Sequence, residues 1–351
     1  MNIRDIKTHA AYLLLLGVLY APTSCQRKND PVPKPVQQRP IELSAATEWP
    51  DSKGIINNVT DLAGDGFVVW ASWSQDLGNG ITKNDMNVFG VQGTKAYYPD
   101  WSYKPTQFWV GARYEFAAVL PASVFNASHG LTGESDTGQQ ITGTFDGKDL
   151  ELDFGDGFDL SASQTDIMYT FTAVDNSDEN ASNAQLDFTD RICSQLRINM
   201  TADISDEKSF EVNRVTIYGI NRSIVGDLTI SNDEDLNVAD IRSLLSDRTT
   251  SDNPYATFTK PDGADWTIKN GQETALVTGL LVFPEVFSTP QPMLIKVKYN
   301  NNDEVEYRLT AGKWAPNSIY TYTLKTGSIV IGEPKVSEWK KGLAIPEIDI
   351  K

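Results

Sequence analysis

The stretch GFVVWASW, residues 66–73, is the clearest structural signal in the sequence. Aromatic and β-branched side chains of this kind are enriched in β-strands. Eight residues is also an ordinary strand length. The stretch therefore predicts a β-strand.

Similar segments continue along the chain, separated by Gly, Asn, Asp and Pro. Their residue types and the breaks between them are typical of short strands joined by turns. A helical pattern is limited to a short stretch at residues 238–245. The sequence therefore predicts an all-β fold. The other strand-like segments include residues 87–91, 114–120, 149–160, 186–200, 212–220, 274–283, 294–299, 304–309 and 320–325.

Two of these regions predict β-hairpins. Residues 149–160, DLELDFGDGFDL, alternate apolar and polar side chains on both sides of Gly155-Asp156-Gly157, which indicates a tight turn. Residues 294–299, LIKVKY, alternate as well, and the turn-like segment 300–303 leads into residues 304–309. We expect each pair of strands to be antiparallel neighbours.

The polar segment 175–185, DNSDENASNAQ, is the best candidate for a domain boundary. A chain of 351 residues has room for about two domains, at roughly 150 residues each. We therefore predict two tandem antiparallel β-sandwich domains, at residues 41–183 and 184–351. The alternative is one domain in which the polar segment is a long exposed loop.

Residues 1–24 have the features of a secretory signal peptide. Basic residues precede an apolar run at 10–21, and small residues follow up to Cys25. The run is shorter than the roughly 20 residues of a membrane-spanning helix. Small residues directly before a cysteine resemble the lipobox of bacterial lipoproteins, which implies acylation of Cys25; the alternative is a simple cleaved signal. Residues 26–40 carry four prolines, so residues 25–40 are predicted to be a lipidated, extended tether.

The charge and cysteine content restrict the function classes. The net charge is −17, and removing residues 1–24, with two basic residues and one acidic residue, makes it −18. Nucleic-acid binding requires basic surface, so no nucleic-acid partner is expected. If Cys25 carries lipid, Cys193 is the only other cysteine, and an intramolecular disulfide is excluded. Stability is then expected to come from apolar cores.

The sequence contains no convincing catalytic set. His129 lies in a polar loop-like segment, and Cys193 lies in a strand-like one, which favours a solvated histidine and a buried thiol. A G-x-S-x-G nucleophile motif is missing, and histidine ligands for zinc are too few. We therefore expect no enzymatic activity and no cofactor.

Two further groups of residues have alternative interpretations. Acidic clusters at residues 153–166 and 233–235 could bind Ca²⁺, but they lack EF-hand spacing, and turn or solubility roles are favoured. The aromatic group Trp101, Tyr103, Phe108 and Trp109 could stack on sugars, which would make the protein a surface glycan-binding lipoprotein. The favoured interpretation places these rings in the core.

Several separated stretches together resemble the fimbrillin-like lipoproteins of Bacteroidales, the subunits of type V pili. Each motif is short, but their order and spacing cover nearly the whole chain after the signal peptide. They are Cys25 with its Pro-rich tether, Ile41-Glu42-Leu43-Ser44, residues 66–73, Trp101-Ser102-Tyr103 with Phe108-Trp109, residues 114–121, 165–169, 186–188 and 194–198, Pro316 to Leu324, and Val336-Ser337-Glu338-Trp339.

The resemblance implies two transthyretin-like β-sandwich domains and an assembly route. A lipidated precursor would reach the bacterial outer membrane, and a trypsin-like protease would remove the tether and first strand. The C-terminal strand of another subunit would fill the exposed site by donor-strand exchange. The protein would then be a fimbrial subunit on the cell surface, with other pilin subunits and a host glycan or protein as partners.

The two ends of the chain carry the residues that this route requires. Arg39 precedes Pro40, a bond that resists trypsin-like enzymes, so cleavage between Lys53 and Gly54 is the expected processing step. At the other end, residues 327–351 are expected to provide the donor strand. Apolar side chains at Leu343, Ile345, Ile348 and Ile350 must be buried either in the chain's own sheet or in a neighbouring subunit.

Overall fold

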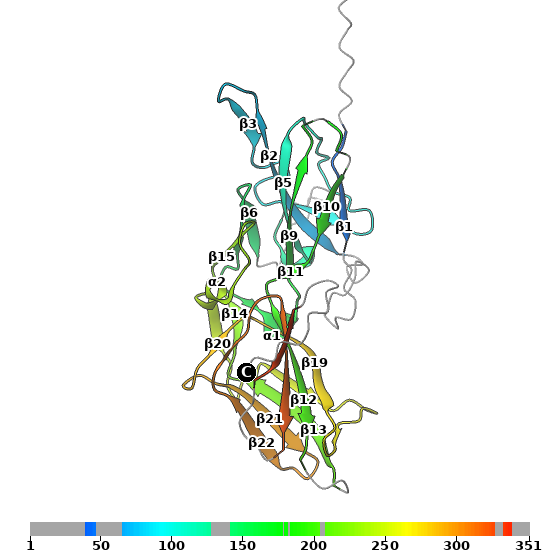
Figure 1. The fold of residues 1–351 in the computed structure, drawn as a ribbon, viewed down its shortest axis with the longest axis vertical. Helices are drawn as coiled ribbons and strands as arrows, with labels where there is room; N and C mark the ends of the chain where they lie inside the picture. Colours follow the sequence, from blue (N-terminus) through cyan, green and yellow to red (C-terminus); the bar gives the residue numbers. More distant parts are fainter. Residues whose placement is uncertain are drawn as a thin grey trace, which may run out of the picture. The chain divides into compact units, whose positions relative to one another are not determined.

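The computed structural model describes residues 39–46, 65–127, 141–177, 179–181, 183–203, 208–326 and 333–338. Within them the protein is almost entirely β, as the sequence predicts, with two short helices, α1 (Leu160–Ser163) and α2 (Val238–Arg242). Figure 1 shows the strands and their order along the chain. Helix α2 confirms the short helical pattern, and Asn237 caps it by accepting from the backbone N–H of Ala239 at 2.8 Å.

A six-stranded antiparallel sheet forms the centre of the N-terminal half. Its strand order is β11-β9-β5-β2-β3, and β4 also pairs with β2. The strand predicted at residues 66–73 is β2 and is confirmed. The bounds are β2 (Gly66–Asp76), β3 (Thr82–Asp85), β4 (Thr94–Tyr97), β5 (Arg113–Leu120), β9 (Met168–Asp175) and β11 (Asp190–Arg191).

The first seven residues of β2, Gly66 to Ser72, are buried on both faces of this sheet. Successive side chains of a strand point to opposite faces. Phe67 and Val69 accordingly lie in one apolar cluster, whereas Val68 and Trp70 lie in another. This arrangement explains why GFVVWASW is a continuous apolar run rather than an alternating one.

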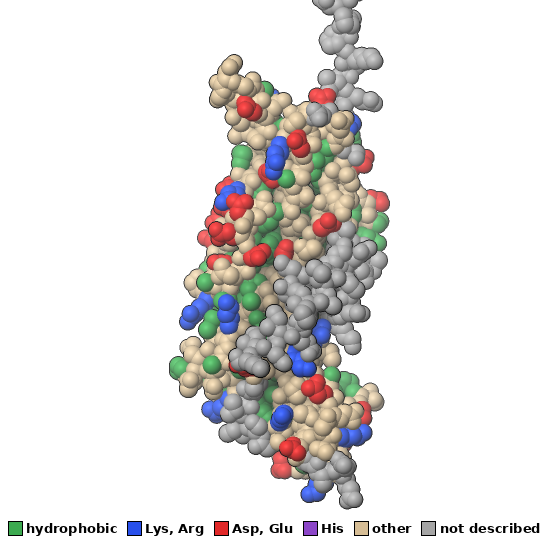
Figure 2. All heavy atoms as spheres, viewed as in Figure 1, with side chains coloured by type: hydrophobic (Ala, Val, Ile, Leu, Met, Phe, Trp, Pro, Cys, Tyr) green, Lys and Arg blue, Asp and Glu red, His purple; other side chains and the backbone are tan. Residues whose placement is uncertain are grey.

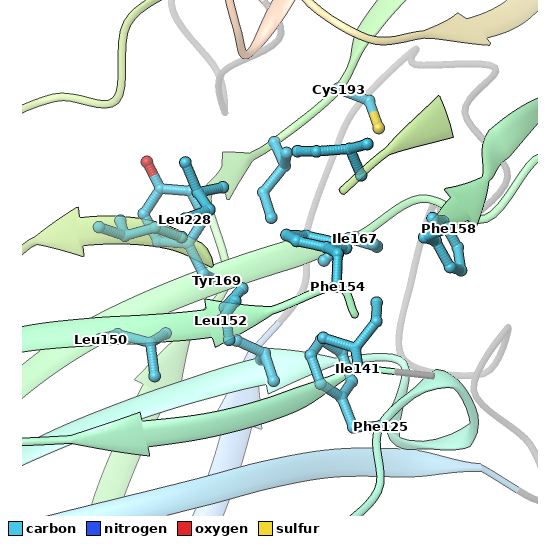
Figure 3. Packing of buried hydrophobic residues seen from close by; sticks show 14 of the residues in the cluster. Phe125, Ile141, Leu150, Leu152, Phe154, Phe158, Ile167, Tyr169, Cys193 and Leu228 are labelled. Atoms are coloured by element: carbon cyan, nitrogen blue, oxygen red, sulfur yellow. The ribbon is translucent and has the colours of Figure 1, made fainter. Parts of the chain in front are cut away.

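One face of the six-stranded sheet is covered by a two-stranded parallel sheet, β1 (Glu42–Ala46) and β10 (Asn183–Asp187). The other face packs against two three-stranded sheets. These are β15-β7-β6 and β16-β14-β8, with bounds β6 (Thr142–Phe145), β7 (Asp149–Asp153), β8 (Phe158–Asp159), β14 (Asn221–Ile224), β15 (Asp227–Ser231) and β16 (Leu245–Arg248). Figure 3 shows the apolar core between these layers, with Phe154, Ile167 and Leu152 near its middle.

The hairpin predicted at residues 149–160 is wrong. Strand β7 pairs with β6 and β15, and β8 pairs with β14, so β7 and β8 are not neighbours. Gly155 and Gly157 adopt positive φ angles of 56° and 140°, as a turn requires. The turn nevertheless leads β8 into a different sheet, because Phe154 and Gly155 bond to the backbone of Gly226 at 2.9 and 3.1 Å.

The C-terminal half contains a sandwich of two sheets around its own apolar cluster. The hairpin predicted from LIKVKY is confirmed, since β21 pairs with β22 from Met293↔Leu309 to Lys298↔Glu304. The four-stranded sheet has the order β19-β12-β24-β25, and the five-stranded sheet has β17-β13-β21-β22 with β18 beside β13. The bounds are β12 (Ser194–Thr201), β13 (Phe210–Tyr218), β17 (Ala256–Thr259), β18 (Thr267–Ile268), β19 (Thr274–Val282), β20 (Val286–Phe287), β21 (Met293–Tyr299), β22 (Glu304–Leu309), β23 (Gly312–Lys313), β24 (Ser318–Lys325) and β25 (Lys335–Glu338).

Strand pairing crosses the predicted boundary between residues 183 and 184. That boundary falls inside β10, and Ala184 and Leu186 pack in the same cluster as β1. In addition, β7 and β8 pair with strands from after residue 220. The division into two domains at residue 184 stays a prediction.

Candidate functional site

The first strand, β1, is attached to the molecule in a way that singles it out. It pairs in parallel with β10, from Glu42↔Asn183 to Ala46↔Asp187. The described residues contain no second strand beside β1, so its other edge has no ladder partner there. An edge strand of this kind depends on side-chain burial for much of its stability.

Burial of β1 and the residue before it follows the alternation of their sequence. Ile41 is 2% exposed and Leu43 is 7% exposed, whereas Glu42 between them points to solvent. Both apolar side chains belong to a cluster with Phe67 and Phe188. We call this cluster together with β10 the β1 seat. Each buried aliphatic side chain contributes roughly 1.5–3 kcal/mol.

Three hydrogen bonds hold the chain that enters β1. The N–H of Trp109 donates to the carbonyl of Arg39 at 2.9 Å, and the N–H of Ile41 donates to the carbonyl of Gln107 at 2.9 Å. The hydroxyl of Tyr103 donates to the carbonyl of Ile41 at 2.7 Å. Burial raises the pKa of Tyr103 to about 12, so the hydroxyl keeps its proton at neutral pH. The backbone at residues 39–41 is therefore fixed before the strand begins.

Three residues of the aromatic group named in the sequence, Trp101, Tyr103 and Trp109, pack in the apolar cluster of the β1 seat. Trp101 is 8% exposed and Trp109 is 6% exposed. The ring of Trp109 packs edge-on against Tyr114 at 4.8 Å, and Trp101 lies 5.0 Å from Phe67. Rings buried in this way are not available to stack on a sugar. Of the group, Phe108 has the most exposed side chain at 42%.

The C-terminal segment expected to provide a donor strand is described only in part. Residues 335–338 form β25, which pairs antiparallel with β24 from Ser318↔Glu338 to Thr321↔Lys335. These residues complete the chain's own sheet. The apolar tail at residues 342–351 lies outside the described residues, as do Cys25, Lys53, Gly54 and His129.

Cys193 is a buried structural thiol, as the sequence favours. It is 0% exposed and lies in the core shown in Figure 3. Burial and the carboxylate of Asp166 raise the pKa of its thiol far above the ordinary range, so it is a poor nucleophile. Arg191 donates to Asp166 at 3.0 Å, and both side chains are fully buried. The ion pair lies at the base of β9 and β11.

The acidic clusters form no metal site in the described part of the chain. No group of three or more potential ligands comes together among those residues. Nor is any described helix both long enough and apolar enough to cross a membrane.

The sequence did not predict that residues of β10 and β2 pack against β1. The alternation of Ala184, Leu186 and Phe188 was a usable signal for a strand with one buried face. The position of that strand beside β1, which is more than 130 residues away in the sequence, required the structure.

The fold is similar to that of a solved fimbrial protein. That protein, from Bacteroides vulgatus, aligns with a TM-score of 0.50 at 14% identity, covering 86% of this chain and 100% of its own. At this identity the likeness establishes the fold.

Two other solved structures align with lower scores. A candidate cell adhesion protein from Bacteroides ovatus has a TM-score of 0.49 at 10% identity, over 87% of this chain and 99% of its own. The tip fimbrial protein Mfa3 from Porphyromonas gingivalis has a TM-score of 0.31 at 9% identity, over 86% of this chain and 100% of its own. No family model matches the sequence, and no curated protein matches it significantly.

Proposed function

We propose that this chain is a structural subunit of a cell-surface fimbria. In this proposal it is exported as a lipoprotein, held at the bacterial outer membrane by lipid on Cys25, and assembled with other subunits by strand exchange. The observation that supports it best is β1, a strand with a single described partner that fills an apolar seat. The fold shared with the Bacteroides vulgatus fimbrial protein supports the same assignment.

The physical basis is the free-energy cost of exposing the β1 seat to water. Cleavage between Lys53 and Gly54 would release residues 25–53, which include β1. The apolar surface that buries Ile41 and Leu43, and one edge of β10, would then be exposed to water. An exposed strand edge and exposed apolar surface together favour pairing with an extended segment from another molecule.

The C-terminal tail has a suitable pattern for that segment. Leu343 and Ile345 are two residues apart, as Ile41 and Leu43 are, and Ile348 with Ile350 repeats the spacing. Residues at this spacing share one face of a strand. The tail of one subunit would therefore bury two side chains where β1 had buried its own.

The test is polymerisation after controlled cleavage. The chain would be produced without residues 1–24, with Cys25→Ser to prevent acylation, and treated with trypsin at low dose. We expect polymers in size-exclusion chromatography and electron microscopy only when residues 342–351 are present and β1 has been released. A matched control, Lys53→Gln, should stay monomeric. Equal polymerisation by the chain that lacks residues 342–351 would refute strand donation by this tail.

Mass spectrometry of the N-terminus of the native protein tests the export and processing steps. An acylated Cys25 would show that the protein keeps its lipid at the membrane. Gly54 at the terminus would show that it is processed. An unmodified terminus elsewhere in residues 26–40 would contradict both steps.

A further inference from the structure

The hairpin formed by β2 and β3 extends beyond the sheet to which it belongs. Strand β2 pairs with β5 no further than Ser74, whereas its pairing with β3 continues to Asp76. Figure 1 shows the hairpin projecting past the end of β5. The N–H of Leu77 donates to the carbonyl of Ile81 at 2.9 Å and closes the apex. Residues 76–85 are all exposed, so this part of the hairpin is surrounded by solvent.

The two faces of the hairpin differ in polarity. Side chains alternate along a strand, and residues opposite each other in an antiparallel pair share a face. One face carries small polar or acidic side chains, those of Ser74, Asp76, Thr82 and Asn84. The other face carries Trp73, Gln75, Lys83 and Asp85, and the same alternation adds Leu77 and Ile81 at its outer end. The apolar side chains of the hairpin therefore lie on one face.

Leu77 and Ile81 form an exposed aliphatic pair at the apex. Their exposed fractions are 55% and 58%. The turn between them contains Gly78 and Gly80 at φ angles of 80° and 76°, which glycine adopts without steric cost. The carboxylate of Asp76 accepts from the N–H of Gly78 at 2.7 Å. Local hydrogen bonds thus hold the two aliphatic side chains opposite each other at the end of the hairpin.

The side chains behind the apex become more polar toward the sheet. Gln75 and Lys83 form the next pair on this face. Trp73 follows, and the ammonium of Lys83 lies 5.7 Å from the centre of its ring. Lysine extends its apolar stem along apolar surface while its ammonium group stays in a polar environment, and tryptophan is enriched where membrane meets water. The order of aliphatic, lysine and tryptophan side chains matches the change from acyl chains to headgroups across a lipid interface.

This order favours a lipid surface over a protein groove. A groove that received the hairpin along its length would have to accommodate Gln75 and Lys83, whereas end-on insertion buries the aliphatic pair alone. Charge supports the same choice, because residues 77–84 carry one charged side chain, Lys83, in a chain of net charge −17. Figure 2 shows few charged side chains on the face of the hairpin in view, whereas acidic side chains gather near β6 and β15. Two copies of so acidic a chain repel each other, and so does an anionic membrane, which leaves zwitterionic lipid as the best match.

We propose that the apex of the β2–β3 hairpin inserts into the surface of a zwitterionic lipid bilayer. Leu77 and Ile81 enter the boundary between headgroups and acyl chains, and Lys83 lies at the level of the lipid phosphates. Binding by one molecule is weak and reversible, since even a single acyl chain is a marginal anchor. The inference rests on the hairpin and depends neither on strand exchange nor on lipid at Cys25.

Sedimentation with sucrose-loaded vesicles of phosphatidylcholine tests the insertion. The chain is produced without residues 1–24 and with Cys25→Ser, so that it carries no lipid of its own. The double variant Leu77→Ser, Ile81→Ser should partition roughly tenfold more weakly, because it loses the apolar area that enters the bilayer. The matched control Val91→Ser removes a side chain that is also 58% exposed but lies outside the hairpin, and it should bind within about twofold of the parent chain. Equal partitioning of the two variants, or no binding by the parent chain, overturns the proposal.

A fluorescent probe beside the apex tests whether the hairpin itself enters the lipid. Cys193 is buried, so a thiol-reactive, environment-sensitive dye would label the new cysteine of Thr82→Cys. Its emission should shift to the blue with phosphatidylcholine vesicles, whereas the same dye at Asp252→Cys, an exposed position outside the hairpin, should not respond. Equal shifts at both positions, or binding that requires anionic phosphatidylglycerol, would contradict insertion of the apex. Self-association without lipid that the double variant abolishes would assign the aliphatic pair to a second copy of the chain instead.

Discussion

Strands β1 and β24 each pair in parallel with a neighbour, but they differ in how many strands flank them. Strand β1 pairs in parallel with β10 over five residues, and β24 pairs in parallel with β12 over seven. Strand β24 also has β25 on its other side, whereas β1 has no second partner among the described residues. The same type of ladder therefore holds a strand with two strand neighbours in one case and a strand with one described neighbour in the other.

Side-chain anchoring reinforces the difference. Tyr320, Tyr322 and Leu324 of β24 all lie in the C-terminal core, and Tyr322 accepts from the indole N–H of Trp314 at 2.9 Å. At the other end of the chain, Ile41 and Leu43 are small aliphatic anchors. A strand that is to be exchanged must be held weakly enough to leave and must leave a seat that another strand can fill.

The largest effect is expected in β24. Tyr322→Ala would remove a side chain that is 1% exposed and leave the N–H of Trp314 without its acceptor. We expect the free energy of unfolding to fall by about 3–5 kcal/mol, the usual cost of deleting a buried aromatic ring. Urea denaturation followed by tryptophan fluorescence measures this. A loss below 1 kcal/mol would show that β24 is not the integral strand of the pair.

A smaller and more local effect is expected in β1. Leu43→Ala should cost about 2 kcal/mol, near the lower limit for buried Leu→Ala changes, because β1 lies at an edge. Hydrogen exchange should accelerate in β1 and β10 and remain unchanged in β12 and β24. Acceleration throughout the protein would show that β1 unfolds only together with the rest, which contradicts its treatment as a separable strand.

The hydrogen bond from Tyr103 at the start of β1 should contribute less to the free energy of unfolding than the side chain of Leu43. Tyr103→Phe keeps the ring and removes the hydroxyl that donates to the carbonyl of Ile41. We expect a loss of about 1 kcal/mol in unfolding free energy. Trypsin cleavage near Lys53 should also become faster if the loss of this hydrogen bond promotes the release of β1. Phe108→Ala is the matched control, because it changes an exposed ring on the same segment.

A dependence on alkaline pH is also expected. Burial raises the pKa of Tyr103 in the folded protein to about 12, from 10.0 in the unfolded chain. Between these values the unfolded state loses the proton and the folded state keeps it, so this contribution to stability falls as pH rises. Wild type should therefore lose more stability than Tyr103→Phe between pH 10 and 12. Parallel stability curves for the two proteins would contradict the assignment.

Local sequence predicted a strand and its neighbour correctly where one face of the strand is buried and the other is exposed. The alternation of LIKVKY predicted β21 and its hairpin partner, because one face is buried and the other is wet. Trp101 and Trp109 of the aromatic group could also be assigned to the core, whereas the same prediction is wrong for Phe108, which is exposed. The hairpin at residues 149–160 failed because alternation and a glycine turn specify two strands without specifying their partners. Both β7 and β8 pair with strands that follow residue 220.

The sequence alone determined that the chain is β-rich and acidic, and that its second cysteine, Cys193, belongs inside. Composition and short-range periodicity carry that information, since they record which side chains avoid water. Only the tertiary structure decided that GFVVWASW is buried on both faces and that β1 rests on a strand from residues 183–187. Those features depend on contacts between residues far apart in the chain, which local patterns do not encode.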